Sequence, residues 1–100
     1  MKDNKNKGWR EFLAIQKKWS EYSDKDNADL WALLLTYEER NQLATRILII
    51  ESLLKKDLPQ REIAKSLGIS IAKITRGSNE LKTLKPSFLD KLRDFFHIKS

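Results

Sequence analysis

The side chains best suited to chemistry are the cationic and polar residues between positions 55 and 85, where eight Lys or Arg face three Asp or Glu. Residues 11–54 carry a net charge of −3, although the whole chain of 100 residues carries +6. A local basic excess attracts polyanions because their condensed counterions are released on binding. Nucleic acid is therefore the first candidate partner, an anionic membrane surface is the second, and a basic surface that is merely solvated remains the alternative.

Catalytic and metal-binding groups are scarce. The chain contains no cysteine and a single histidine, His97, which excludes thiolate nucleophiles, disulfides and zinc fingers. No acid/base pair, nucleophile or metal cluster occurs at catalytic spacing, so we expect neither an enzyme nor a metalloprotein. No apolar run approaches the about 20 residues that cross a bilayer, and no signal-peptide core follows the N-terminus, so we expect a soluble cytoplasmic protein.

Two short helices are predicted within the segment PQREIAKSLGISIAKITRGSNEL, residues 59–81. Pro59 suits the start of the first helix, Gly68 ends it, and Ser70 can cap a second helix that runs to about residue 84. The connection of about three residues is typical of a helix-turn-helix. The apolar residues expected to pack between the two helices are Ile63, Ala64, Leu67, Ile69 and Ile74.

A DNA-bound helix-turn-helix places the N-terminal residues of its second helix against base edges in the major groove. Arg61, on the first helix, could present its planar guanidinium to guanine, or could form a surface ion pair with a nearby carboxylate. Ser78 and Asn79 are expected to bind phosphates. The candidate DNA-binding residues are Gln60, Arg61, Ile71, Ala72, Lys73, Thr75, Arg76, Ser78, Asn79 and Lys82.

The remaining elements are also predicted to be helical, because three glycines and two prolines leave few breaks. Thr36 and Glu39 form a capping box that starts a long helix ending near Lys56. Apolar residues outside its main face, Leu48 and Ile49, suggest a partner subunit. The other expected elements are a disordered basic arm at 1–7 that could touch phosphates, a helix at about 8–22, a polar link at 22–27, a short buried helix at 28–35 and a last helix at 86–97.

Two stretches of the chain resemble a known family in order and spacing. They are LLLTYEERNQLATR at 33–46 and QREIAKSLGISIAKITRGSNELK at 60–82, and they resemble the bacterial trp repressor family. The most specific part is ITRGSN, Ile74 to Asn79, because a generic helix-turn-helix has no reason to place Arg-Gly in its second helix. The resemblance covers about residues 9–97.

The resemblance implies an all-α, six-helix intertwined homodimer that binds double-stranded operator DNA. Its single domain would span 8–100, with dimerisation helices at 8–56 and 86–97 and the helix-turn-helix at 59–84. The implied function is transcriptional repression activated by L-tryptophan as corepressor, with control of tryptophan biosynthesis or uptake genes. The three tryptophans of the chain are expected to serve packing rather than ligand binding.

The family pattern also implies a ligand site. Arg46 would pair with the tryptophan carboxylate, Arg76 would lie along the indole, and Gly77 would leave room for the ring. Leu33, Leu35 and Thr36 would line the pocket and offer backbone carbonyls to the ammonium group. The alternatives are an ion pair of Arg46 with Glu39 or Glu51, and a Gly77 that only bends its helix.

Glu80 departs from the family pattern and would lie near the ammonium group of the ligand. It could strengthen ammonium binding, favour another amine such as tryptamine, or capture Arg76 instead. Two rival functions remain at this point: a helix-turn-helix protein that binds DNA without a ligand, and a helical bundle whose basic block binds acidic proteins or a membrane surface.

Overall fold

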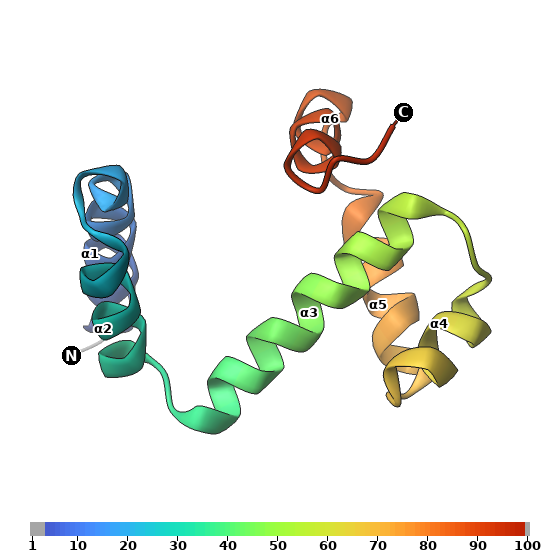
Figure 1. The fold of residues 1–100 in the computed structure, drawn as a ribbon, viewed down its shortest axis with the longest axis horizontal. Coiled ribbons are helices and arrows are strands. Elements are labelled where there is room, and N and C mark those ends of the chain that lie inside the picture. Colours follow the sequence, from blue (N-terminus) through green and yellow to red (C-terminus); the bar gives the residue numbers. More distant parts are fainter. Residues whose placement is uncertain (1–3, 100) are drawn as a thin grey trace. The chain divides into compact units, whose positions relative to one another are not determined.

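The computed structural model describes residues 4–99, which form six α-helices and one short 3-10 helix (Figure 1). No strand occurs in this part of the chain, so the all-α prediction is confirmed. None of the described helices is both long and apolar enough to span a bilayer. The chain divides into two compact units between Tyr37 and Glu38. The elements are α1 (Asn4–Lys17), η1 (Trp19–Glu21), α2 (Asp24–Leu34), α3 (Tyr37–Lys55), α4 (Gln60–Leu67), α5 (Ile71–Leu81) and α6 (Pro86–Phe95).

The first helix begins earlier than the sequence pattern predicts. Residues 4–7, expected to be disordered, form the first turn of α1, whereas residues 1–3 of the expected arm lie outside the described residues. Lys7 donates a hydrogen bond to Glu11 one turn later and thereby holds the pKa of this carboxyl below its ordinary value. Pairs at this spacing stabilise a helix, and we attribute the longer helix in part to this one.

Aromatic side chains hold the first unit together. The Phe12 ring makes edge contacts with Trp19 and Trp31, with ring centroids 5.9 Å apart in both pairs. Trp19 and Trp31 lie closer, at 4.7 Å, and Trp9 stacks on Phe12 at 5.4 Å. Such pairs contribute beyond the area they bury. The expected packing role of the tryptophans therefore agrees with their contacts.

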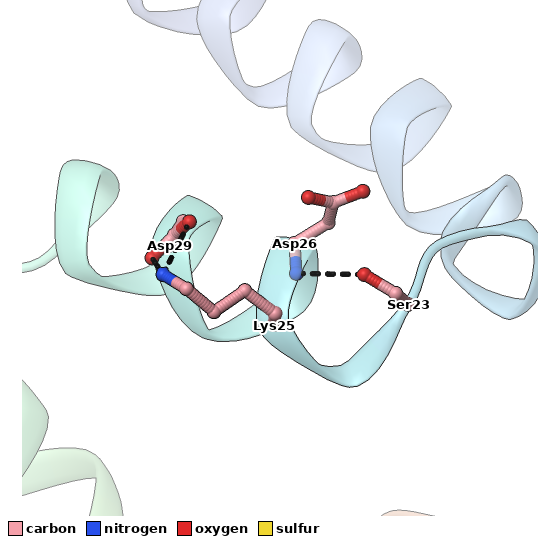
Figure 2. A network of polar contacts seen from close by, with 4 residues as sticks. All are labelled: Ser23, Lys25, Asp26 and Asp29. Carbon is pink, nitrogen blue, oxygen red and sulfur yellow. Dashed lines mark hydrogen bonds and ion pairs between the residues drawn. The ribbon is translucent and has the colours of Figure 1, made fainter.

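The helix α2 begins at Asp24, four residues before the predicted start, so the expected polar link at 22–27 is too long. Ser23 is the reason, because its hydroxyl accepts the backbone N–H of Asp26 at 3.1 Å and caps the helix (Figure 2). Lys25 then donates to both carboxylate oxygens of Asp29 at 2.9 and 3.0 Å. The expectation of a buried helix is not met within one chain, since no residue of α2 is buried and Leu33 is 82% exposed.

In the second unit, α3, α4 and α5 share one apolar core. Its buried residues are Ile49 of α3, Ile63 and Ala64 of α4, and Ile74 of α5, which is fully buried. Leu53, Leu67 and Ile69 pack against this core. The predicted contacts between the two short helices are therefore confirmed, and α3 completes the core from a third side.

The turn between α4 and α5 also follows the prediction. Pro59 accepts the backbone N–H groups of Glu62 and Ile63 at 3.0 and 3.1 Å and thus starts α4. Gly68 ends it with a left-handed backbone, φ 68°, which glycine adopts without a Cβ penalty. Ser70 caps α5, because its hydroxyl accepts the N–H of Lys73 at 3.4 Å. The two helices pack against each other and form a helix-turn-helix (Figure 1).

Gly77 lies on the side of α5 that faces α3. A Cβ added at this position would lie 3.1 Å from Ile49 Cγ2 and 3.4 Å from Leu53 Cδ1. Ile49 is only 5% exposed, so it has little space to move. Packing against α3 therefore favours a glycine here, independently of any ligand.

The last helix starts with Pro86 at its first position, as predicted, but it ends at Phe95 rather than at residue 97. The chain turns at His97, whose φ is 58°, and the Ile98 N–H donates to Arg93 O at 2.8 Å. This closing bond leaves His97 outside the helix. Phe88 and Phe95 remain 44% and 73% exposed in the single chain.

We predict that Gly77→Ala destabilises the protein although alanine favours helix. The overpacking of Ile49 should cost about 1–3 kcal/mol, against a helix-propensity gain of about 1 kcal/mol. Gly8→Ala in α1 is the matched control, because nothing lies within 4 Å of its added Cβ, and it should not destabilise. Urea denaturation measures both, and a Gly77→Ala protein as stable as Gly8→Ala would contradict the close packing.

A second prediction concerns Lys56, which follows α3 with a φ of 57°. Glycine avoids the steric cost of this left-handed backbone, so Lys56→Gly should raise the free energy of unfolding by about 0.5–1 kcal/mol. Lys55→Gly removes the same charge from the last helical residue and should lower it. Equal thermal shifts for the two variants would show that the backbone at Lys56 is not strained.

Candidate DNA interface and ligand site

The helix α5 has one buried face and one open face. Ile74 is fully buried, and Gly77 and Ser78 are partly covered. The other predicted DNA-binding residues of this segment are exposed: Ile71, Ala72, Lys73, Thr75, Arg76, Asn79 and Lys82. The arrangement leaves an exposed face on the second helix of the helix-turn-helix, with polar and cationic side chains beside the apolar Ile71 and Ala72.

The N-terminus of α5 is suited to approach DNA. Ile71 is 49% exposed, so an apolar side chain of the first turn is available for contact with a thymine methyl group. Ala72 follows it and is short, and Lys73 adds a positive charge beside the positive end of the helix dipole. Phosphate oxygens are the natural partners of such an end.

A hydrogen bond joins the two helices on this open side. The Thr75 hydroxyl lies 3.1 Å from Gln60 Oε1 and 3.1 Å from the carbonyl oxygen of Ile71, and its single proton can be donated to either. Gln60 and Thr75 were both predicted to contact DNA, but their pairing was not predicted. They are 15 residues apart, and no local spacing signals the contact.

The candidate arginines are open to solvent. Arg61 is exposed in the first turn of α4 and forms no ion pair with any residue that the structure describes. Arg46 is exposed on α3 and is likewise unpaired within residues 4–99. Glu51, considered as its partner, lies 3.6 Å from Lys55 instead. Both guanidinium groups are therefore available to an anion.

An open hollow of about 580 Å³ lies along the exposed face of α5. Its lining residues repeat at helical spacing and are Ala72, Thr75, Arg76, Asn79, Glu80 and Thr83. Arg76 supplies the one cation and Glu80 the one carboxylate of this lining. The two are one turn apart, yet no ion pair joins them in the described part of the chain. Thr83 was missed by the sequence analysis, although it follows Arg76 by seven residues on the same face.

Only some of the predicted ligand residues line the hollow. Arg76 and Glu80 line the hollow together, whereas Arg46 does not line it. Gly77 faces α3, so the interpretation of this glycine through ligand approach alone is incomplete. Leu33 lies in α2 of the first unit, and Leu35 and Thr36 form the link to α3. Among the described residues, no group of three His, Cys, Asp or Glu could hold a metal ion.

Comparison with known proteins agrees with this architecture. Residues 7–95 match the family described as Trp repressor protein. A protein of Chlamydia trachomatis serovar D named "Trp operon repressor homolog" is 45% identical over 93 residues, which cover 93% of this chain and 97% of that relative. A protein of the same name from Chlamydia caviae is 42% identical, and the match covers 92% of this chain and 89% of that relative. Another, from Histophilus somni, is 45% identical, and the match covers 82% of this chain and 76% of that relative.

The matched region contains α4 and α5 and all but the first three residues of α1. The helix-turn-helix formed by α4 and α5 is a motif typical of DNA-binding transcription factors, which agrees with the matched family. The chain belongs to the Trp repressor family of DNA-binding regulators.

Proposed function

We propose that this protein is a transcriptional repressor that binds operator DNA as a homodimer when L-tryptophan occupies a site beside α5. The observation that carries the proposal is the open face of α5, where the candidate DNA-binding side chains are exposed and Arg76 and Glu80 line a hollow. The name of the relatives, "Trp operon repressor homolog", supports the same role. The regulated genes would be those of tryptophan biosynthesis or uptake.

In the proposed complex α5 enters the major groove. Ile71 and Ala72 meet apolar base edges, Lys73 and Thr75 offer polar contacts, and Arg61 presents two N–H groups to guanine. The phosphate contacts come from residues with exposed or partly exposed donors: Gln60, Arg76, Ser78, Asn79 and Lys82. The net charge of +5 over residues 55–85 supplies the attraction that does not depend on base sequence.

The apolar surface of the single chain supports the homodimer. Leu33 and Leu34 of α2 are 82% and 43% exposed, and Ile47 and Leu48 of α3 are 44% and 47% exposed. Exposed apolar residues on successive helices mark an interface, and a second copy carries the same faces. A symmetric dimer would present two α5 helices to half-sites about one helical turn apart.

The proposed ligand site fits a zwitterionic aromatic molecule. Arg46 binds the carboxylate and Arg76 stacks on the indole. Gly77 keeps α5 close to α3, because an added Cβ would meet Ile49 and Leu53. Both arginines are exposed and form no ion pair within residues 4–99, which supports this arrangement, because neither has to leave a partner there to bind the ligand.

Regulation then follows from a population shift. Tryptophan binds the DNA-competent arrangement of the two reading helices more tightly than other arrangements, so it increases the fraction that can bind DNA. By linkage, operator DNA must tighten tryptophan binding by the same factor.

A direct test measures DNA affinity with and without tryptophan. A duplex selected from a random pool in about millimolar L-tryptophan serves as probe in fluorescence anisotropy, and the ligand should raise affinity about 5- to 150-fold. Equal affinity without ligand would indicate a constitutive DNA-binding protein. If the protein bound all duplexes weakly and salt abolished this binding, the result would indicate a basic helical bundle that does not recognise bases.

Arg61→Ala tests the assignment of base contacts. Loss of a bidentate arginine–guanine contact should cost about 1–3 kcal/mol of discrimination at one base pair and leave tryptophan affinity unchanged. Lys91→Ala removes one exposed charge from α6 and should preserve base preference. The role of Arg61 would be refuted if the Arg61→Ala protein and the unmodified protein showed the same order of affinities for operators that differ at a single base pair.

A further inference from the structure

The side chains of Gln60 and Thr75 connect α4 to α5 by a hydrogen bond of 3.1 Å. Gln60 lies on the same face of α4 as Ile63 and Ala64, because residues three and four positions apart are neighbours on a helix. Those two residues pack with Ile74 in the buried core, whereas Gln60 is only partly covered and Thr75 is exposed. The hydrogen bond therefore marks the solvent edge of the contact between the two helices.

The Thr75 hydroxyl is held by its own helix. It lies 3.1 Å from the carbonyl oxygen of Ile71, one turn earlier in α5, and a contact of this kind selects the rotamer of a helical threonine. Gln60 has a longer side chain, which loses rotamer freedom when it is held. Water can replace an exposed hydrogen bond at small net cost. The stability of the fold therefore does not explain why the glutamine is held.

The hydrogen bond determines which part of the Gln60 amide stays available. When Thr75 donates to Oε1, the amide carbonyl is occupied and the amide nitrogen keeps two N–H groups. No residue between 4 and 99 accepts a hydrogen bond from this nitrogen. Phosphate oxygens of DNA accept such N–H groups, whereas a bidentate contact with adenine would also need the amide carbonyl. A group that is already oriented loses less freedom on binding.

We infer that Thr75 is a positioning residue, which holds the Gln60 amide with its N–H groups available to a DNA phosphate. The inference rests on the proposed DNA contact of Gln60 and not on the tryptophan site. Its consequence is that the Thr75 hydroxyl acts through Gln60, so that its removal should matter much less once Gln60 is absent.

The test is a double-mutant cycle in the full-length protein, with DNA affinity measured by fluorescence anisotropy on a duplex selected from a random pool. Gln60→Ala and Thr75→Val should each weaken binding about 3- to 10-fold, as the loss of a hydrogen bond implies. In the Gln60→Ala protein, the loss caused by Thr75→Val should be at least about threefold smaller. Thr75→Ser keeps the hydroxyl and should retain most of the affinity.

Two further measurements separate positioning from a structural role. Gln60→Ala should weaken binding to operators that differ at one base pair by the same factor, because a phosphate contact carries no base information. The same cycle in urea denaturation should show a smaller coupling than the cycle in DNA affinity, since water replaces the exposed bond in the free protein.

Thr45→Val is the matched control. The exposed Thr45 hydroxyl donates to the carbonyl oxygen of Asn41 at 3.0 Å, which is the same contact one turn back, but in α3. Whatever its own effect, it should combine additively with Gln60→Ala.

The inference would be overturned if the losses from Gln60→Ala and Thr75→Val simply multiplied in the double variant, or if Thr75→Ser bound as weakly as Thr75→Val. A coupling that is equally large in urea denaturation would show a structural role instead. DNA binding that does not need tryptophan would refute only the corepressor role, because the cycle can still be measured. An unmodified protein that selects no duplex would refute operator binding itself, and the inference with it.

Discussion

The contact of Ile74 with Ile49, Ile63 and Ala64 is the interaction on which the second unit depends. These four residues come from three helices, and Ile74 is fully buried among them. Because a close-packed core tolerates little displacement, fixing Ile74 fixes which side of α5 faces inward. The opposite side, with Arg76 and Glu80, is thereby turned to solvent. The core thus orients the surface that we propose reads DNA.

The same core links the DNA face to α3, which carries Arg46. Gly77 allows α5 to approach Ile49 and Leu53, with only 3.1 and 3.4 Å left for an added Cβ. Ile49 of α3 and Ile74 of α5 also share one buried core, so the two helices are packed together. In the proposed mechanism a ligand held by Arg46 and Arg76 acts on both helices at once, which gives tryptophan a physical route to the reading helix.

Local chemistry accounts for the predictions that the structure confirms. Gly68 and Ser70 define the turn because a left-handed backbone and a capping hydroxyl are properties of single residues. The starts of α3, α5 and α6 were predicted from the same kind of signal. The start of α2 was missed because Ser23 lies inside a polar run, and such a run is as typical of a link between helices as of a helix start. The extent of α1 was underestimated because its first residues lack an apolar stripe.

The sequence by itself determined the helical fold, the helix-turn-helix, its inward-facing residues and the identity of the exposed side chains of α5. These features depend on periodicity and capping within about one helical turn. Only the tertiary structure decided that Gln60 meets Thr75, that Gly77 faces α3, and that Arg76 and Glu80 share a hollow without pairing. Such contacts depend on how closely helices approach and which rotamers the approach leaves open. No spacing along the chain encodes those quantities.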